Sequence, residues 1–245
     1  MLKTKKTGHT AHLLKSALVS VLLSLVAIDA SAETGPIVQL KPGNWVVMGS
    51  STAFGSGAPR GKGWVALLEA AYAKHGVQVI NIASRGTVTY RGLSTSSLRV
   101  TRRPPPERKR NVDAALALQP ALLIVSYPTN DTASGYSVDE TVDNLLAIRA
   151  QAQVAGVAVI VTSTQPRNLD DTKLPRLRAV DDRLAASVGP CFVEMREALA
   201  NADGKLAPQY DAGDGVHPNS AGHAVIAEHV IGLIESKRCV RLPQD

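Results

Sequence analysis

Short runs of apolar, β-favouring residues alternate with longer amphipathic segments along most of this chain. The apolar runs lack polar interruptions, which is typical of strands buried on both faces of a sheet. They lie at 45–48, 77–82, 121–126, 157–162 and 191–193, and helical patterns lie near 64–75, 111–118, 137–155, 173–188, 194–202 and 220–236. Strand–helix alternation indicates βαβ units. The pattern therefore predicts a three-layer α/β/α fold around a mainly parallel sheet of about five strands.

One helix is marked by signals at both of its ends. Ser137 and Glu140 have the spacing of a capping box, in which each residue satisfies a backbone N–H of the first turn. Apolar residues then recur every three or four positions until Gly156, a residue that commonly ends helices. We expect a helix over 137–155, and we find no internal repeat and no sign of a second domain.

The first 32 residues have the pattern of a secretory signal peptide. Four lysines precede a short apolar stretch at 17–28, and Ala30-Ser31-Ala32 then forms an A-x-A cleavage pattern. The stretch is short for a membrane span, which needs roughly 20 residues. We expect residues 33–245 to form the mature domain, without a stable membrane anchor, in a secreted or periplasmic protein.

The basic balance of the chain lies partly in this leader. The formal net charge of the whole chain is +6, whereas residues 33–245 carry 23 basic and 20 acidic side chains, or +3. Within the mature part, the segment 99–110 gathers six basic residues around three prolines, which favour an extended loop. Its simplest interpretation is a solvated surface loop, and the alternative is a rim that attracts an anionic surface or substrate. It lacks interleaved aromatic residues, so nucleic-acid binding is not expected.

Two cysteines, Cys191 and Cys239, are the only ones in the chain. In an oxidising compartment they could pair and tie the C-terminal tail to the body of the domain. The alternative is two unpaired thiols. Two distant cysteines supply too few ligands for a metal site, and neither a metal nor an organic cofactor is expected.

Polar residues follow the predicted strands, and ligands of parallel sheets bind beyond the carboxyl ends of strands. The loops that could meet there contain Ser51, Gly86, Asn130 and the Asp214–His217 segment. A hydroxyl, a glycine, an amide and an Asp/His pair are the components of a serine hydrolase. A phosphate-binding loop at Gly61-Lys62 fails on spacing, and no G-x-S-x-G elbow surrounds Ser51.

Elimination among the histidines leaves one candidate base. His9 and His12 lie in the leader, and His75 stands at a predicted helix end. His223 falls on the apolar face of the last helix, where packing is its expected role, and His229 lies further along that helix. His217 alone lies in a loop before a helix, with Asp214 three residues earlier to orient its ring.

Taken together, these four segments resemble the conserved blocks of the SGNH, or GDSL-type, serine hydrolases. Gly49-Ser50-Ser51 with Gly55 is similar to the first block, Gly86 to the second, Asn130-Asp131 to the third, and Asp214-Gly215-Val216-His217 to the D-x-x-H of the last. Each block alone is a weak signal, but the four occur in the expected order over about residues 44–236. The resemblance implies an SGNH (flavodoxin-like) fold and a carboxylic ester hydrolase. It makes Ser51 the nucleophile, Asp214 and His217 its partners, and Ser51, Gly86 and Asn130 the oxyanion hole.

Two positions depart from the family pattern. Ser50 replaces an aspartate that normally supports the turn, and Pro128 replaces a glycine. We expect Ser50 to substitute locally for the aspartate and Thr52 to cap or pack the turn. Neither departure removes a reacting group, but both motivate an alternative: a catalytically weakened module that binds glycan or lipid on the same scaffold. A third hypothesis is an adhesion or structural surface protein that uses the basic loop.

The favoured hypothesis is a secreted esterase that forms an acyl-enzyme on Ser51. No long apolar lid is evident in the sequence, so small acyl groups are the expected substrates. Secreted members of the family that this chain resembles act on acetylated glycans, lysophospholipids or simple esters, and the resemblance does not distinguish among these.

Overall fold

The computed structural model describes residues 1–2 and 37–242. The chain divides into two units, Met1–Glu33 and Thr34–Asp245, and the fold described below lies in the second. The expected signal peptide, residues 1–32, lies almost entirely outside the described residues.

Five parallel strands form the main sheet, in the spatial order β3-β2-β4-β5-β6. Their bounds are Gly43–Gly49 (β2), Val77–Asn81 (β3), Leu122–Ser126 (β4), Ala158–Thr162 (β5) and Phe192–Val193 (β6). The predicted sheet, with about five mainly parallel strands, is confirmed. After β2 the chain adds β3 on one side of β2, and it later adds β4 on the other side. The loops that follow β2 and β4 therefore leave in opposite directions and form a topological switch point. Folds of this type bind ligands at such a point.

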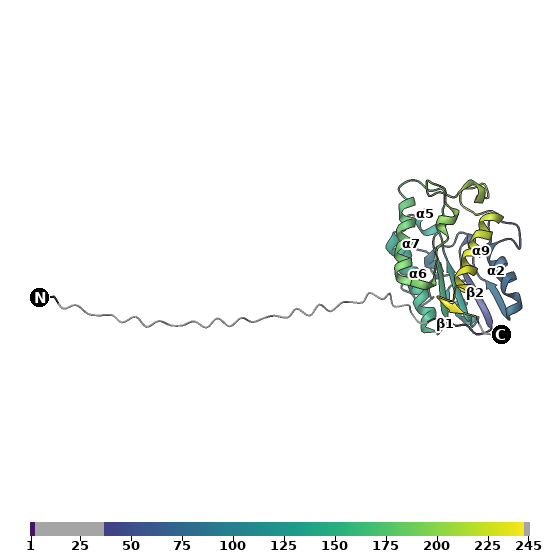
Figure 1. Cartoon of the computed structure of the whole chain (residues 1–245), viewed down its shortest axis with the longest axis horizontal. Helices are drawn as coiled ribbons and strands as arrows, with labels where there is room; N and C mark the ends of the chain where they lie inside the picture. The colour runs from purple at the N-terminus through teal and green to yellow at the C-terminus, as the bar shows by residue number, and fades with distance from the viewer. Residues whose placement is uncertain (3–36, 243–245) are drawn as a thin grey trace. The chain divides into compact units, whose positions relative to one another are not determined.

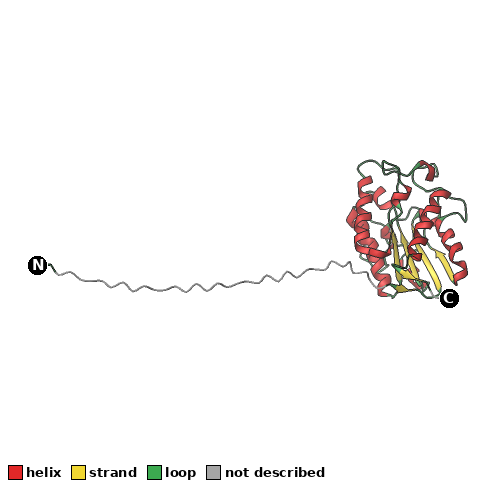
Figure 2. Ribbon diagram, in the orientation of Figure 1, coloured by secondary structure: helices red, strands yellow, loops and turns green. Residues whose placement is uncertain are grey.

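The continuous apolar strands are buried because helices cover both faces of the sheet. Trp45 and Val47 of β2 enter one hydrophobic cluster, with residues of α2 (Trp64–Tyr72) and α9 (Ser220–Glu235). Val46 and Met48, which point the other way, enter a second cluster with residues of α6 (Val138–Val154) and α7 (Leu174–Val188). Figure 1 shows α6 and α7 on one side of the strands and α2 and α9 on the other, and Figure 2 shows the same layers by colour.

Most of the predicted helices are present, and the capping box at Ser137 and Glu140 forms as expected. Shorter elements are α1 (Ser51–Phe54), η1 (Ala73–His75), α3 (Thr89–Gly92), α4 (Val112–Ala117), α5 (Asn130–Ala133), η2 (Gly189–Cys191), α8 (Arg196–Leu199) and η3 (Pro208–Tyr210). The helix predicted over 194–202 was wrong in length, because α8 has only four residues. Ala200 instead pairs antiparallel with Leu206 across a turn.

A second, two-stranded parallel sheet was not predicted. It joins β1 (Val38–Gln39) to β7 (Val240–Arg241), near the two ends of the described domain. Cys239, just before β7, forms a disulfide with Cys191 in η2. The possible disulfide between Cys191 and Cys239 is therefore present in the structure.

The segment 93–111 contains neither helix nor strand, in agreement with its prolines. It is held to the body by Arg103, whose guanidinium bonds Glu140 at 2.7 Å and lies 4.1 Å from the ring centroid of Tyr136. Within the described residues, no helix combines the length and the apolar character that crossing a membrane requires.

Candidate active site

The turn after β2 brings Ser51 to the carboxyl edge of the sheet. Gly49 is required there, because a Cβ at this position would lie 1.9 Å from the carbonyl oxygen of Ser126 on β4. The chain turns directly into α1, held by backbone bonds from Ser50 N–H to Ser126 O (3.0 Å) and from Phe54 N–H to Ser50 O (2.9 Å). Ser51, the first residue of α1, is thus fixed by backbone contacts on both sides.

The loop before α9 holds Asp214 and His217 in a fixed relation. Asp214 Oδ1 accepts hydrogen bonds from the backbone N–H groups of Val216 (2.9 Å) and His217 (2.8 Å). Its other oxygen, Oδ2, lies 2.6 Å from His217 Nδ1. One carboxylate therefore shapes the turn and binds the imidazole, so that His217 Nε2 is left to face Ser51.

Ser51, His217 and Asp214 form one hydrogen-bonded chain, although Ser51 is 166 residues from His217 in sequence. His217 Nε2 lies 2.9 Å from Ser51 Oγ. Partial burial of Asp214 works against its charge, but the hydrogen bonds from His217 and Val216 outweigh this effect and lower the Asp214 pKa to about 2. Asp214 is therefore ionised at neutral pH and favours a proton on His217 Nδ1, which leaves Nε2 free to accept the hydroxyl proton.

The three groups predicted to hold an oxyanion differ in the hydrogen bonds that they already make. Within the described part of the chain, neither the N–H of Ser51 nor that of Gly86 donates to another protein group. Asn130, which begins α5 after β4, donates one amide hydrogen to the carbonyl of Thr87 (3.0 Å) and keeps a second amide hydrogen. Gly86 has φ +68°, a backbone conformation that glycine adopts without strain.

Arg167, which the sequence reasoning missed, lies beside the predicted oxyanion asparagine. It follows β5, and its Nη1 donates to Asn130 Oδ1 (3.3 Å), which orients the amide hydrogens away from the arginine. Burial lowers the Arg167 pKa, and the charge of Asp214 opposes this shift. Its position in the sequence could have indicated Arg167, because the segment 163–170 follows a predicted strand, as the other site loops do.

The segment 163–170 also makes hydrogen bonds to the loop that carries His217. Gln165 Nε2 donates to the carbonyl of Val216 (2.6 Å), and Asn168 N–H donates to that of Gly215 (2.7 Å). The loop after β5 thus contacts both the amide side and the histidine side of the site.

The other histidines lie where packing or surface roles account for them. His223 is fully buried in α9; its Nδ1 accepts from Trp64 N–H (3.2 Å) and its Nε2 donates to Ser56 O (2.9 Å). His75 ends η1, and His229 Nδ1 contacts the carbonyl oxygen of Glu194 (2.6 Å).

Both departures from the family pattern, Ser50 and Pro128, are buried. Ser50 is buried and precedes α1, but its side chain makes no capping hydrogen bond, so it does not replace an aspartate in that role. Thr52 is buried, in line with the packing role expected of it. Pro128 is buried between Tyr127 and Thr129.

Among the described residues, no group of three His, Cys, Asp or Glu side chains is placed to hold a metal ion.

The chain matches the model of the GDSL-like lipase/acylhydrolase family over residues 47–225. The chain belongs to this family. It is accordingly a carboxylic ester hydrolase of the GDSL type, and the matched range contains all five residues proposed for the site.

Individual relatives agree with this assignment. Esterase TesA of Pseudomonas aeruginosa is 24% identical over 222 residues, which cover 89% of this chain and 96% of TesA. A crystal structure of TesA superposes with a TM-score of 0.61 at 24% identity, covering 79% of this chain and 99% of that one. A GDSL-like lipase from Bacteroides thetaiotaomicron gives 0.59 at 21% identity, covering 80% and 89%. Structural likeness at these identities shows the shared fold.

Proposed function

We propose that Ser51 is the nucleophile of this esterase and that His217, oriented by Asp214, is its general base. Ser51 Oγ attacks the carbonyl carbon of the ester while His217 Nε2 takes the hydroxyl proton. When the tetrahedral intermediate collapses, the bond to the alcohol oxygen breaks and the imidazolium returns the proton to that oxygen. Water then attacks the acyl-enzyme, again with His217 as base, and releases the acid and the free serine.

The negative oxygen of the intermediate is held by three donors in this proposal: the N–H groups of Ser51 and Gly86 and the amide of Asn130. Loss of one such donor typically lowers kcat by roughly 100- to 1,000-fold. The observation that carries the mechanism is the chain of contacts from Ser51 Oγ to His217 Nε2 and from His217 Nδ1 to Asp214.

Small acyl groups are the proposed substrates, including acetyl groups on glycans. Asn130, the predicted oxyanion asparagine, has polar neighbours: it donates to the carbonyl of Thr87 and accepts from the guanidinium of Arg167. Such a surface offers little apolar area to a long acyl chain, whose binding energy would come from burial. An esterase active on acetylated mannans shares the fold with a TM-score of 0.55 at 16% identity. Lysophospholipid-type esters are the other substrates that we propose.

Export to the periplasm or the outside of the cell is the proposed location. The leader pattern in residues 1–32 and the Cys191–Cys239 disulfide support this, because disulfides persist in oxidising compartments.

The test is hydrolysis of p-nitrophenyl acetate, butyrate and octanoate at neutral pH by wild type and by Ser51→Ala. We expect turnover by wild type that falls as the acyl chain lengthens and that Ser51→Ala abolishes. A folded wild type that is no faster than Ser51→Ala on any of the three esters would favour the alternative, a catalytically weakened glycan- or lipid-binding module.

A further inference from the structure

A cavity of about 190 Å³ lies beside the proposed oxyanion hole. It is lined by Ser84, Arg85, Gly86, Thr87, Arg91, Glu107 and Arg110. Three arginines against one glutamate give it an excess of two positive charges. A volume of this size holds a small group of a few atoms, since one water occupies about 30 Å³ in the liquid.

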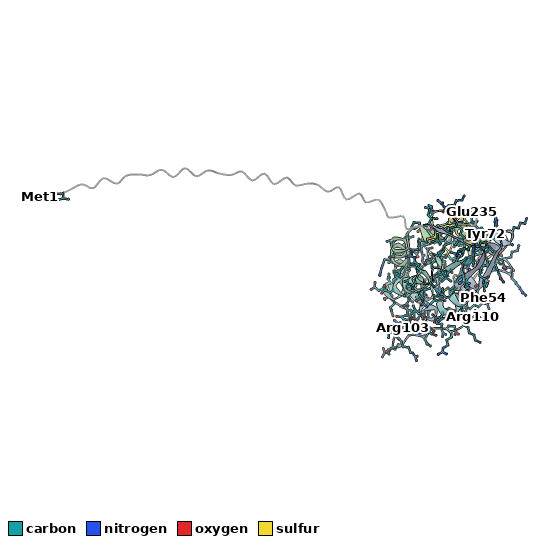
Figure 3. All side chains as sticks on the ribbon, turned by 90° about the horizontal axis from the view of Figure 1, so that it is seen from below. Met1, Phe54, Tyr72, Arg103, Arg110 and Glu235 are labelled. Atoms are coloured by element: carbon teal, nitrogen blue, oxygen red, sulfur yellow. A yellow bond between two sulfur atoms is a disulfide. The ribbon has the colours of Figure 1, made fainter. Side chains whose placement is uncertain are left out.

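Two of these arginines are fixed by contacts that leave their charge unpaired. Arg85 Nε donates to Ser56 Oγ (3.0 Å), and the Arg85 guanidinium lies 4.6 Å from the ring centroid of Phe54. Arg110 Nη1 donates to the backbone carbonyls of residues 82–83, at 3.1 and 2.9 Å. In the described part of the chain, neither guanidinium has a carboxylate within 4.0 Å. In the view of Figure 3, the labels of Phe54 and Arg110 lie next to each other.

The third arginine, Arg91, is partly neutralised. Its Nη1 lies 3.7 Å from Glu107 Oε2, and both side chains are about two-fifths exposed. An ion pair so exposed and so long contributes little free energy. Glu107 therefore competes only weakly with an incoming anion for Arg91, and removing its charge would leave all three arginines free.

The cavity borders one residue of the proposed oxyanion hole and a neighbour of another. Gly86 lines it and is the proposed backbone donor. Thr87, the next lining residue, accepts the hydrogen bond that positions Asn130. An ester whose carbonyl oxygen occupies the oxyanion hole would place a nearby substituent against the arginines.

We propose that this cavity binds an anionic group, a carboxylate or a phosphate, carried by the ester substrate within a few bonds of the scissile carbonyl. The planar fork of arginine matches both groups, and pre-positioned guanidinium groups lose little freedom on binding. This inference rests on the proposed esterase function and narrows its substrate class to charged esters.

The experiment compares kcat/KM for neutral phenyl acetate with that for three anionic esters. The anionic esters are 4-acetoxybenzoate and 4-acetoxyphenyl phosphate, charged on the alcohol side, and monophenyl glutarate, charged on the acyl side. The enzymes are wild type, Arg91→Gln, Glu107→Gln and Arg108→Gln. Arg108 is the control, because it is an exposed arginine directly after Glu107 that does not line the cavity.

For at least one anionic ester, we expect Arg91→Gln to lower the anionic-to-neutral ratio of kcat/KM roughly 10-fold, as for loss of a charge-assisted hydrogen bond. Glu107→Gln should raise the same ratio, and Arg108→Gln should leave it within twofold of wild type. The ester that responds identifies the charged group and its side of the substrate. If Arg91→Gln and Arg108→Gln change all three ratios equally, the arginines act only as general surface charge and the inference is wrong.

Binding to Ser51→Ala, measured by calorimetry with 4-acetoxybenzoate, 4-acetoxyphenyl phosphate, monophenyl glutarate and phenyl acetate, separates this inference from the proposed function. The inference is supported if at least one anionic ester binds more tightly than phenyl acetate and if Arg91→Gln removes this difference. This holds even if wild type shows no turnover. Equal binding of all four esters overturns the inference even if wild type hydrolyses phenyl acetate.

Discussion

At the scale of single residues, Gly57 lies against the loop that carries His217, the proposed base, and leaves no room there for a side chain. A Cβ at this position would lie 2.2 Å from Pro218 O and 2.9 Å from His217 Cβ, and φ is +93°. We expect Gly57→Ala to displace His217 and to lower kcat at least 10-fold, because small misplacements of a catalytic base are costly. Steady-state hydrolysis of p-nitrophenyl acetate measures this.

Gly61→Ala is the matched control for that prediction. Gly61 also has a positive φ, +79°, but a Cβ there has no neighbour within 4 Å. Both variants carry the backbone strain of alanine at positive φ, so only contact with the histidine loop distinguishes them. A kcat for Gly57→Ala equal to that of Gly61→Ala would contradict this role of Gly57.

His223 makes the stability of the fold depend on pH. Burial lowers its pKa below the ordinary 6.5, because its imidazole is held neutral between Trp64 and Ser56. The unfolded chain takes up this proton below about pH 6.5 while the folded protein resists it, so stability is lost as pH falls through that value. We expect wild type to lose more free energy of unfolding between pH 7.5 and 5 than His223→Gln, by up to about 1.4 kcal/mol per pH unit.

Urea unfolding of wild type and of His223→Gln, each at pH 7.5 and at pH 5, measures this difference in the free energy of unfolding. Asp131 acts with the opposite sign, since burial raises its pKa to about 6 and this reduces stability as pH rises from about 4 to 6. Asp131 is present in both proteins, so their difference isolates His223. Parallel pH profiles would contradict the prediction.

Single residues also mark the limit of what the sequence could predict about the site. Ser51, Asp214 and His217 belong to recognisable blocks, and the structure brings them within hydrogen-bonding distance. Gly57 and Arg167 belong to no block, and their importance lies in contacts with residues far away in the chain. Such contacts depend on how loops pack, which a linear pattern does not contain.

At the scale of elements, the loop before α9 depends on one carboxylate outside the D-x-x-H block. Asp211 Oδ1 accepts hydrogen bonds from three backbone N–H groups, those of Gly213 (2.8 Å), Asp214 (3.2 Å) and Gly215 (3.0 Å). These bonds hold the backbone that carries Asp214 and His217 in one conformation. The sequence analysis placed Asp211 in the loop before this helix but assigned it no role.

We expect Asp211→Ala to lower kcat roughly 10-fold with little change in KM, because each side-chain hydrogen bond contributes about 1 kcal/mol to holding the loop. Asp211→Asn keeps the accepting oxygen and should retain most of the activity. Kinetics on p-nitrophenyl acetate compare the two. Equal losses in both variants would show that the charge of Asp211, and not its hydrogen bonds, supports the loop.

Long elements were predictable because their residues repeat one pattern many times. The strand patterns at 121–126 and 157–162 became β4 and β5 almost residue for residue, and the 137–155 helix became α6. β1 and β7 have two residues each, too few for a periodic signal, and their pairing depends on the chain ends meeting in space. The 194–202 helix failed because the Ala200–Leu206 pairing ends α8 early.

At the scale of the whole molecule, the disulfide joins the C-terminal strand to the central domain. Cys191 and Cys239 are 48 positions apart in sequence, and β7, directly after Cys239, pairs with β1. Cross-linking a loop of this length restricts the unfolded chain and typically stabilises a fold by about 2–5 kcal/mol. The bond therefore supports both ends of the described domain.

We expect Cys191→Ala/Cys239→Ala to lower the free energy of unfolding by that amount, measured by urea denaturation, with kcat changed less than twofold. The activity should persist because the disulfide lies in η2 and before β7, away from the loops that carry Ser51 and His217. Reduction of wild type with dithiothreitol should give the same destabilisation. Unfolding curves that coincide with and without the bond would contradict this account.

The central claim is that Ser51 carries the covalent intermediate, and labelling with a fluorophosphonate tests it most directly. Such a probe phosphonylates a serine only when a base activates it, and peptide mass spectrometry locates the adduct. We predict one adduct on Ser51 in wild type, none in Ser51→Ala, strongly slowed labelling in His217→Ala, and normal labelling in the neighbouring control Ser50→Ala. An active wild type that is labelled at another residue, or that is labelled equally fast without His217, would contradict the account.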